Sequence, residues 1–200
     1  MAELRFSYGV MSAGKSTLAL QVEHTWTEAG RAGVLLTSHD RGGAGTVTSR
    51  LGLCRDAVEV APSTDLWLLV QNALPEGGFV VADEAQFYTP RQIDELAHCV
   101  DERDIDVACF GLMSDFMGRL FPATARLVEL ADVLVPLPLP VLCWCGRPAR
   151  LNARLVDGVV VREGARVLLG DTTATGGALF GPDVRYQVLC RKHWMTRETG

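Results

Sequence analysis

The 200-residue sequence contains no apolar run of the roughly 18 to 20 residues that a membrane-spanning helix needs. Its first residues lead directly into strand-like sequence and lack the apolar segment of a secretory signal. The composition, 48% hydrophobic and 22% charged, is that of an ordinary globular protein with enough apolar material for a core. We therefore expect a cytoplasmic protein with no membrane partner.

Basic residues are too few and too scattered for a nucleic-acid-binding surface. The formal net charge is −5, and the longest basic cluster is Arg191-Lys192-His193. Proteins that bind the phosphate backbone of a nucleic acid usually carry a basic surface. The charge pattern therefore predicts no nucleic-acid partner.

Apolar segments of strand length alternate with segments of helical periodicity. Strands are predicted at residues 4–8, 34–36, 79–82, 107–110 and 133–135, and helices at residues 15–29, from 90 onward, and near 125–131. Strands that are apolar throughout indicate a parallel sheet covered on both faces. Residues 41–46 are predicted to form a loop and the proline-rich residues 136–140 a linker. The sequence thus predicts an α/β core over residues 1–140 and a second domain over 141–200.

A glycine-bearing turn joins the first predicted strand to the first predicted helix. It fits the pattern GxxxxGK[ST] at every fixed position: Gly9, Val10, Met11, Ser12, Ala13, Gly14, Lys15 and Ser16. In such a loop, backbone N–H groups and the helix N-terminus surround phosphate groups. Lys15 would reach the β- and γ-phosphates, and the Ser16 hydroxyl would bind Mg²⁺. The pattern predicts a binding site for ATP with Mg²⁺.

Two adjacent carboxylates, Asp83 and Glu84, follow the apolar strand at residues 79–82. In a parallel sheet, the end of this strand lies on the same edge as the phosphate loop. Asp83 is therefore a candidate for the Mg²⁺ shell. If the chain is still extended, Glu84 points elsewhere and is free to take a proton from an acceptor hydroxyl.

Six cysteines occur, and in a reducing compartment clustered ones indicate metal rather than disulfides. Cys54, Cys99 and Cys109 are scattered and are predicted to be small buried hydrophobic residues. The remaining three cysteines, Cys143, Cys145 and Cys190, form with His193 a Cys₃His set suited to a structural Zn²⁺ site.

Several blocks of the sequence together resemble the type II thymidine kinase family. They are Gly9 to Thr17, Asp83-Glu84-Ala85-Gln86-Phe87, Phe110-Gly111-Leu112 with Asp115-Phe116, and Tyr186 ahead of Cys190-Arg191-Lys192-His193. The blocks occur in the family's order and extend over nearly the whole chain. The first cysteine pair departs from the family pattern, because it is Cys-x-Cys where the family usually has Cys-x-x-Cys.

The resemblance implies a RecA-like P-loop core and a small C-terminal zinc-binding domain whose long loop, the lasso, closes over the nucleoside. The family positions imply Glu84 as catalytic base, Asp83 as the Mg²⁺-associated acid, and a contribution of Ala85 and Gln86 to the nucleotide site. The implied substrate-binding residues are Met11, Phe87, Leu112, Phe116, Asn152 and Tyr186. The lasso corresponds to residues 167–186. The resemblance also implies a homotetramer inhibited by dTTP.

The leading hypothesis is therefore an ATP-dependent thymidine kinase that serves nucleotide salvage for DNA synthesis. Two alternatives keep the phosphate loop: a kinase for another deoxynucleoside, and an ATPase with a zinc-ribbon module. The acidic balance argues against a nucleic-acid-binding module, and the block from Asp83 to Phe87 argues against the ATPase.

Overall fold

The structure is a computed structural model that describes residues 1–38, 45–164 and 183–200. The described chain divides into two compact units. The first, which we call the core unit, comprises residues 1–9, 14–113 and 121–137, and the second unit comprises residues 10–13, 114–120 and 138–200. Within the described ranges, no helix combines the length and apolar character needed to cross a bilayer.

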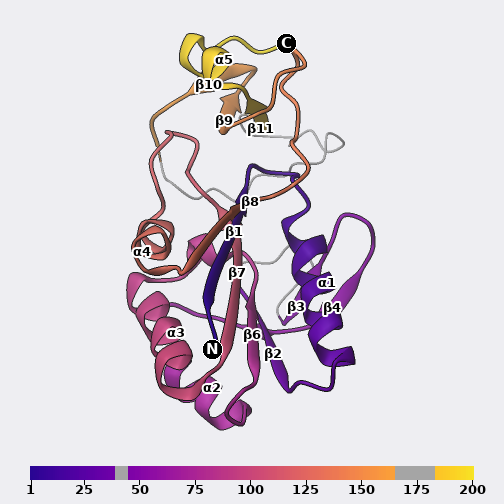
Figure 1. Ribbon diagram of the computed structural model, residues 1–200. Helices are drawn as coiled ribbons and strands as arrows, with labels where there is room; N and C mark the ends of the chain where they lie inside the picture. The colour runs from indigo at the N-terminus through magenta and orange to yellow at the C-terminus, as the bar shows by residue number, and fades with distance from the viewer. Residues whose placement is uncertain (39–44, 165–182) are drawn as a thin grey trace. The chain divides into compact units, whose positions relative to one another are not determined.

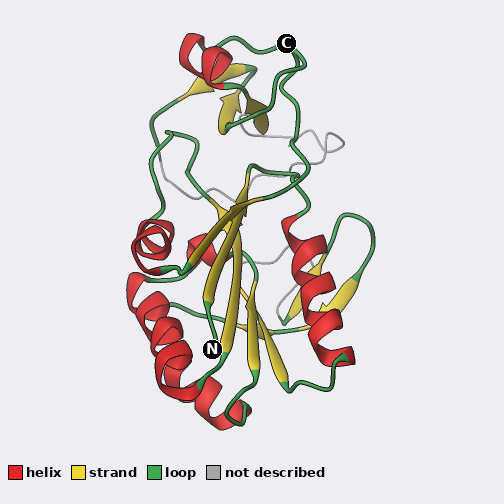
Figure 2. Ribbon diagram, in the orientation of Figure 1, coloured by secondary structure: helices red, strands yellow, loops and turns green. Residues whose placement is uncertain are grey.

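The core unit is built on a six-stranded sheet in which every pairing is parallel (Figures 1 and 2). Its strand order is β5 (Val58–Glu59), β2 (Gly33–Thr37), β6 (Phe79–Ala82), β7 (Asp106–Leu112), β1 (Leu4–Gly9) and β8 (Val133–Pro136). A separate antiparallel pair consists of β3 (Thr46–Thr48) and β4 (Cys54–Asp56). The predicted α/β class with a parallel sheet is confirmed.

Helices cover both faces of this sheet. Helix α1 (Lys15–Glu28) lies on one face, and α2 (Leu66–Ala73), α3 (Pro90–Arg103) and α4 (Pro122–Leu130) lie on the other (Figure 2). Strand β6 is apolar throughout because its two faces both pack against helices. Phe79 and Val81 pack in the cluster with α1, whereas Val80 and Ala82 pack in the cluster with the other three helices.

The ends of the elements follow from local sequence signals. Thr89 caps α3 through a reciprocal capping box with Gln92, and Pro90 occupies the first helical turn. Helix α4 begins at Pro122, three residues before the predicted start. Pro136 is part of β8 rather than a linker, because β8 is an edge strand that pairs only with β1.

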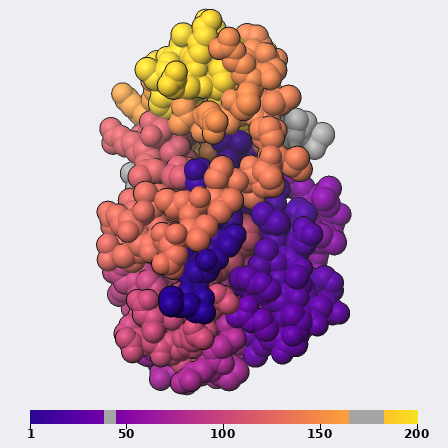
Figure 3. All heavy atoms as spheres, in the orientation of Figure 1, coloured from indigo at the N-terminus to yellow at the C-terminus, as the bar shows by residue number. Residues whose placement is uncertain are grey.

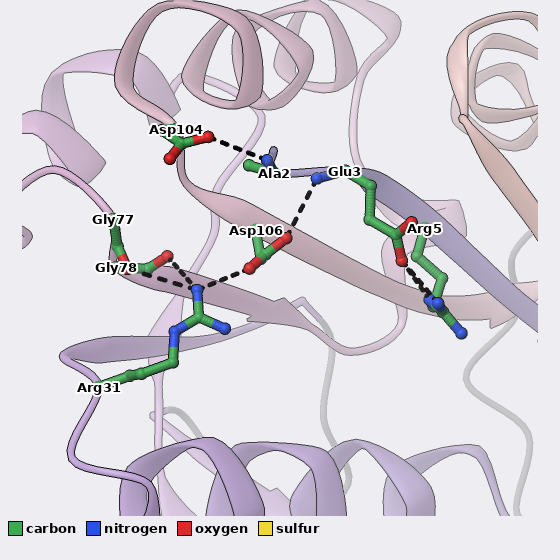
Figure 4. A network of polar contacts seen from close by, with 8 residues as sticks. All are labelled: Ala2, Glu3, Arg5, Arg31, Gly77, Gly78, Asp104 and Asp106. Atoms are coloured by element: carbon green, nitrogen blue, oxygen red, sulfur yellow. Dashed lines mark hydrogen bonds and ion pairs between the residues drawn. The ribbon is translucent and has the colours of Figure 1, made fainter.

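A polar network joins the start of β1 to the loops at the same end of the sheet (Figure 4). The Arg31 guanidinium donates to Asp106 Oδ2 at 2.7 Å and to the carbonyl of Gly78 at 3.0 Å. Asp106 Oδ1 accepts from the backbone N–H of Glu3 at 3.1 Å. The Arg31 guanidinium also lies 5.1 Å from the Trp26 ring centroid. The N-terminal residues nevertheless lie at the surface (Figure 3).

The second unit contains a three-stranded antiparallel sheet in the order β10 (Val159–Val161), β9 (Leu151–Val156) and β11 (Val184–Leu189), followed by α5 (Arg191–Thr196). Its small core includes Ala153, Val160, Leu189 and Trp194. Of the predicted loop at 41–46, residues 41–44 lie outside the described residues, and Thr46 begins β3. Of the predicted lasso, residues 167–182 also lie outside them. Cys99 and Cys109 are buried as predicted, but Cys54 is exposed on β4.

Candidate active site

The structure places the predicted phosphate loop between β1, which ends at Gly9, and α1, which begins at Lys15. Two left-handed residues turn the chain, Ser12 with φ of 65° and Gly14 with φ of 82°. Between them, Ala13 N–H donates to the Val10 carbonyl at 3.3 Å. The Lys15 side chain is buried. The backbone therefore has the tight turn into a helix N-terminus that anion binding requires.

Asp83 lies at the end of β6 with 2% of its surface exposed. Burial, and next the charge of Glu84, raise the pKa of Asp83 to about 7, while a hydrogen bond from Ser16 and the charge of Lys15 act in the opposite direction. Within the described chain, the buried Asp83 Oδ1 has no hydrogen-bond partner. A buried carboxylate oxygen beside a serine hydroxyl matches the oxygen ligands that Mg²⁺ prefers. Ser16 and Asp83 therefore fit the predicted Mg²⁺ site.

Glu84 is not a continuation of the strand. Its φ of 52° and ψ of 35° are left-handed, so the condition of a still-extended chain is not met at this point. A short 3₁₀ turn, η1 (Ala85–Phe87), follows and brings the buried Gln86 back toward β7. The Gln86 side-chain oxygen accepts from Leu112 N–H at 2.9 Å, and its NH₂ group donates to Glu84 Oε2. Gln86 therefore holds the Glu84 carboxylate in one orientation.

The same arrangement explains a glycine in β7. A Cβ atom on Gly111 would lie 2.8 Å from Gln86 Oε1, closer than real Cβ atoms approach, and 3.3 Å from Gln86 N, which is also a tight contact. Only glycine at this position lets Gln86 approach the end of β7.

The other predicted substrate residues of the core unit, Phe87 and Leu112, are half-buried. The Phe87 ring packs edge-on against Phe121 with centroids 5.8 Å apart. The Leu112 carbonyl accepts from Thr124 Oγ1 at 2.9 Å. Leu112 is the last residue of β7 and Phe87 lies in the turn after β6, so both are at the carboxyl ends of parallel strands, on the edge where α/β proteins bind ligands.

The second unit brings the remaining predicted substrate residues together. Asn152 Oδ1 on β9 accepts from Met11 N–H at 2.9 Å. Two residues along the strand, the Arg154 guanidinium carbon lies 3.6 Å from the Phe116 ring centroid, and Arg154 Nε donates to the Tyr186 hydroxyl at 3.0 Å. Sequence reasoning missed Arg154, since only the strand register opposite Tyr186 distinguishes it from the other arginines.

The predicted zinc ligands are assembled in the second unit. The candidate ligand atoms of Cys143, Cys145, Cys190 and His193 all lie within 4.8 Å of one another. Cys143 Sγ is 3.4 Å from His193 Nδ1, and Cys145 Sγ is 3.9 Å from Cys190 Sγ. A tetrahedral Zn²⁺ with S and N ligands places neighbouring ligand atoms roughly 3.5 to 3.8 Å apart. The Cys-x-Cys spacing therefore still permits a zinc-sized site.

The surroundings of this cluster also suit a metal. Burial raises the pKa of the Cys143 thiol, but hydrogen bonds from the backbone of Cys145 and Cys190 and from His193 outweigh it and lower the pKa to about 6. The thiolate is the form that binds metal. His193 Nε2 lies 3.6 Å from Glu198 Oε2, and Trp144 stacks on the imidazole with centroids 4.2 Å apart. These contacts leave Nδ1 directed toward the three sulfur atoms.

Comparison with known proteins identifies the same family through a sequence model and through individual relatives. A sequence model of the family described as thymidine kinase matches residues 2–194. Relatives named thymidine kinase from Cutibacterium acnes and Streptomyces coelicolor are 51% and 50% identical over 203 residues, covering 100% of this chain and 91% of each relative. Another, from Novosphingobium aromaticivorans, is 40% identical over 198 residues, covering 97% of both chains.

Proposed function

The chain belongs to the thymidine kinase family and phosphorylates thymidine; we propose that Glu84 is the general base for transfer of the γ-phosphoryl group of ATP to the nucleoside 5′-hydroxyl, giving dTMP and ADP. The observation that carries this proposal is the contact between Glu84 and Gln86. Gln86 is itself held by Leu112 N–H, so its amide presents a donor to one carboxylate oxygen. The other oxygen of Glu84 is then available to accept the hydroxyl proton.

The phosphate loop supplies charge and position. Backbone N–H groups of residues 9–16 and the start of α1 bind the phosphates, and Lys15 contributes its positive charge to the β- and γ-phosphates. Ser16 and Asp83 hold the Mg²⁺ ion, which supplies charge neutralisation for the phosphates when bound. Ala85 and Gln86 complete the nucleotide site. In this arrangement the two neighbouring carboxylates have separate tasks, because Asp83 is buried beside Ser16 while Glu84 turns away from the strand.

The thymidine-binding residues are assigned on the family motif together with the contacts seen within each unit. In the second unit these are Met11, Phe116, Asn152 and Tyr186, which cluster around one face of β9. In the core unit they are Phe87 and Leu112. Most of these side chains are apolar or aromatic, which suits a small pyrimidine with a 5-methyl group. Zn²⁺ held by Cys143, Cys145, Cys190 and His193 has a structural role, because all four ligands come from protein and leave no open position.

Four further properties belong to the same proposal. The family resemblance supports a homotetramer and feedback inhibition by dTTP. A cytoplasmic location agrees with reduced cysteines available for zinc. Formation of dTMP from thymidine and ATP would serve nucleotide salvage for DNA synthesis.

The test compares Glu84→Gln with Glu76→Gln, a matched change at an exposed residue of the core unit. We expect Glu84→Gln to lower kcat about 10²- to 10⁴-fold, the usual cost of losing a general base, with little change in the KM for ATP. Glu76→Gln should match wild type. An unchanged kcat with a raised KM for ATP would instead make Glu84 a ligand of the metal or nucleotide.

Substrate choice is tested with wild-type enzyme, ATP and Mg²⁺ on four nucleosides. We expect deoxyuridine to trail thymidine modestly, because one methyl group in an apolar pocket contributes about 1 to 3 kcal/mol. Deoxyadenosine and deoxyguanosine should be at least about tenfold poorer in kcat/KM, since overfilling a packed pocket costs roughly 1 to 3 kcal/mol. Equal use of purines would refute the assigned pocket residues.

A further inference from the structure

Arg154 has an unusual environment for a charged residue. It lies on β9 with 1% of its surface exposed and is the largest of the fully buried side chains described. Removing a guanidinium from water is costly unless its surroundings replace the lost hydration. The contacts of the guanidinium must therefore compensate for its lost hydration.

Those contacts include two aromatic rings. The Arg154 guanidinium carbon lies 3.6 Å from the Phe116 ring centroid and 5.5 Å from the Tyr186 ring centroid. Arg154 Nε also donates to the Tyr186 hydroxyl at 3.0 Å, and the two residues are direct partners in the β9–β11 register. A desolvated cation over an aromatic face is strongly attracted to it. One guanidinium group thus fixes both the ring of Phe116 and the hydroxyl of Tyr186.

Strand β9 also contacts the segment of residues 10–13 through a hydrogen bond. Asn152, which is two residues before Arg154 and so on the same face of β9, accepts from Met11 N–H at 2.9 Å. This face of β9 therefore contacts Met11, Phe116 and Tyr186. Residues 10–13 and 114–120 belong to the second unit, so these contacts lie within one compact body.

We propose that Arg154 is a positioning residue for thymidine binding: its guanidinium sets the orientation of Phe116 and Tyr186 before the nucleoside arrives. The inference rests on the proposed function, which gives these two aromatic residues to the substrate. Arg154 itself does not contact the reacting atoms. Preorganised side chains lower the cost of ordering on binding, so the effect falls on thymidine affinity. Lysine cannot replace the group, because stacking on Phe116 depends on the planar guanidinium.

The test uses Arg154→Met, which keeps an apolar stem of similar length, and Arg162→Met as the matched control. Arg162 also stacks on an aromatic ring of this unit, with its guanidinium carbon 3.9 Å from the Trp194 centroid, and donates to the Met195 carbonyl at 3.3 Å. It contacts none of the residues assigned to thymidine in these interactions. The control thus removes a half-buried cation–π contact without changing a contact of the residues assigned to thymidine.

We expect Arg154→Met to raise the KM for thymidine about tenfold, in line with the loss of a desolvated cation–π contact. Its kcat and its KM for ATP should stay within about twofold of wild type, since Arg154 acts through Phe116 and Tyr186 and does not contact the reacting atoms. Arg162→Met should leave the KM for thymidine unchanged, whatever it does to thermal stability. A purely structural role for Arg154 would lower the active fraction, and so kcat, while leaving the KM for thymidine unchanged.

A double-mutant cycle with Tyr186→Phe gives a second measurement. That change removes the hydroxyl bonded to Arg154, and in the Arg154→Met background it should raise the KM for thymidine by less than it does alone. Full additivity would overturn the inference. If Arg154→Met does not fold, Arg154→Lys replaces it, with Arg162→Lys as control, and an unchanged KM for thymidine in Arg154→Lys overturns the inference as well. Failure of the wild-type enzyme to phosphorylate thymidine would refute the proposed function instead.

Discussion

The raised pKa of Asp83 predicts that the protein without added Mg²⁺ loses stability between pH 6 and pH 8. Burial, then the charge of Glu84, raise this pKa to about 7 in the folded protein. In the unfolded chain the pKa of an aspartic acid is about 3.9. The folded state therefore holds more protons than the unfolded state between these values, and stability falls as the pH rises through this interval.

The magnitude follows from the same pKa. At pH 6, one unit below the pKa of Asp83 in the folded protein, proton binding at Asp83 stabilises the folded state by about 1.4 kcal/mol relative to the ionised form. By pH 8 this stabilisation has disappeared. The side chain is 2% exposed, so solvent screening does not reduce the effect. For a chain of 200 residues, a loss of this size lowers Tm by roughly 3 to 6 °C. Asp83→Asn, which is neutral at both pH values, should lack this component.

The assay is calorimetric Tm at pH 6 and pH 8 for wild type, Asp83→Asn and Asp101→Asn, an exposed control. Mg²⁺ is omitted rather than chelated, because a chelator would also remove zinc. Titrating groups that do not interact with Asp83 contribute equally to all three proteins and cancel in the comparison. We expect wild type and Asp101→Asn to lose roughly 3 to 6 °C more than Asp83→Asn. An equal loss in all three proteins would mean that Asp83 is ionised throughout and that its burial is offset by its neighbours.

Three other predictions concern separate parts of the molecule. Lys15→Ala should reduce phosphoryl transfer to less than about a tenth with little change in Tm, because the lysine contributes charge to the phosphates; activity above that level would refute the site. Metal analysis of protein prepared without chelator should find about one Zn²⁺ per chain, and Cys190→Ser should lose it and unfold the second unit first. Arg31→Met should lower the free energy of unfolding by about 1 to 3 kcal/mol in urea titrations, because it breaks charged hydrogen bonds to Asp106 and Gly78. Arg5→Met, which breaks only the exposed pair with Glu3, should lower it by about 1 kcal/mol or less.

The sequence predicted the central sheet because each strand is buried on both faces. Phe79, Val80, Val81 and Ala82 are all fully buried, so their hydrophobicity is continuous and easy to recognise. The three-stranded sheet of the second unit gave no comparable signal. Its strands carry side chains such as Asn152 and Arg154, which are buried through specific polar and aromatic contacts rather than through hydrophobicity. Strand β4 is exposed along its whole length and left no pattern at all.

The sequence proposes the residues of the candidate site but does not predict its geometry. The phosphate-loop motif and the carboxylate pair are local in sequence, so spacing alone identified them. The sequence predicts different directions for Asp83 and Glu84 only if the chain stays extended, whereas a left-handed residue separates them in the structure. Single-residue backbone conformations of this kind depend on the contacts that follow them, here those of Gln86 with Leu112.

Those contacts explain why two blocks that are distant in sequence occur together in this chain. The block from Asp83 to Phe87 ends β6, and the block Phe110-Gly111-Leu112 ends the neighbouring strand β7. The left-handed Glu84 and the 3₁₀ turn return Gln86 to the Leu112 N–H group, and this bond turns the amide donor toward Glu84. A side chain at position 111 would collide with the Gln86 oxygen. The two blocks are therefore halves of one arrangement, in which Gly111 of β7 and Gln86 of the 3₁₀ turn after β6 set the direction of the Glu84 carboxylate.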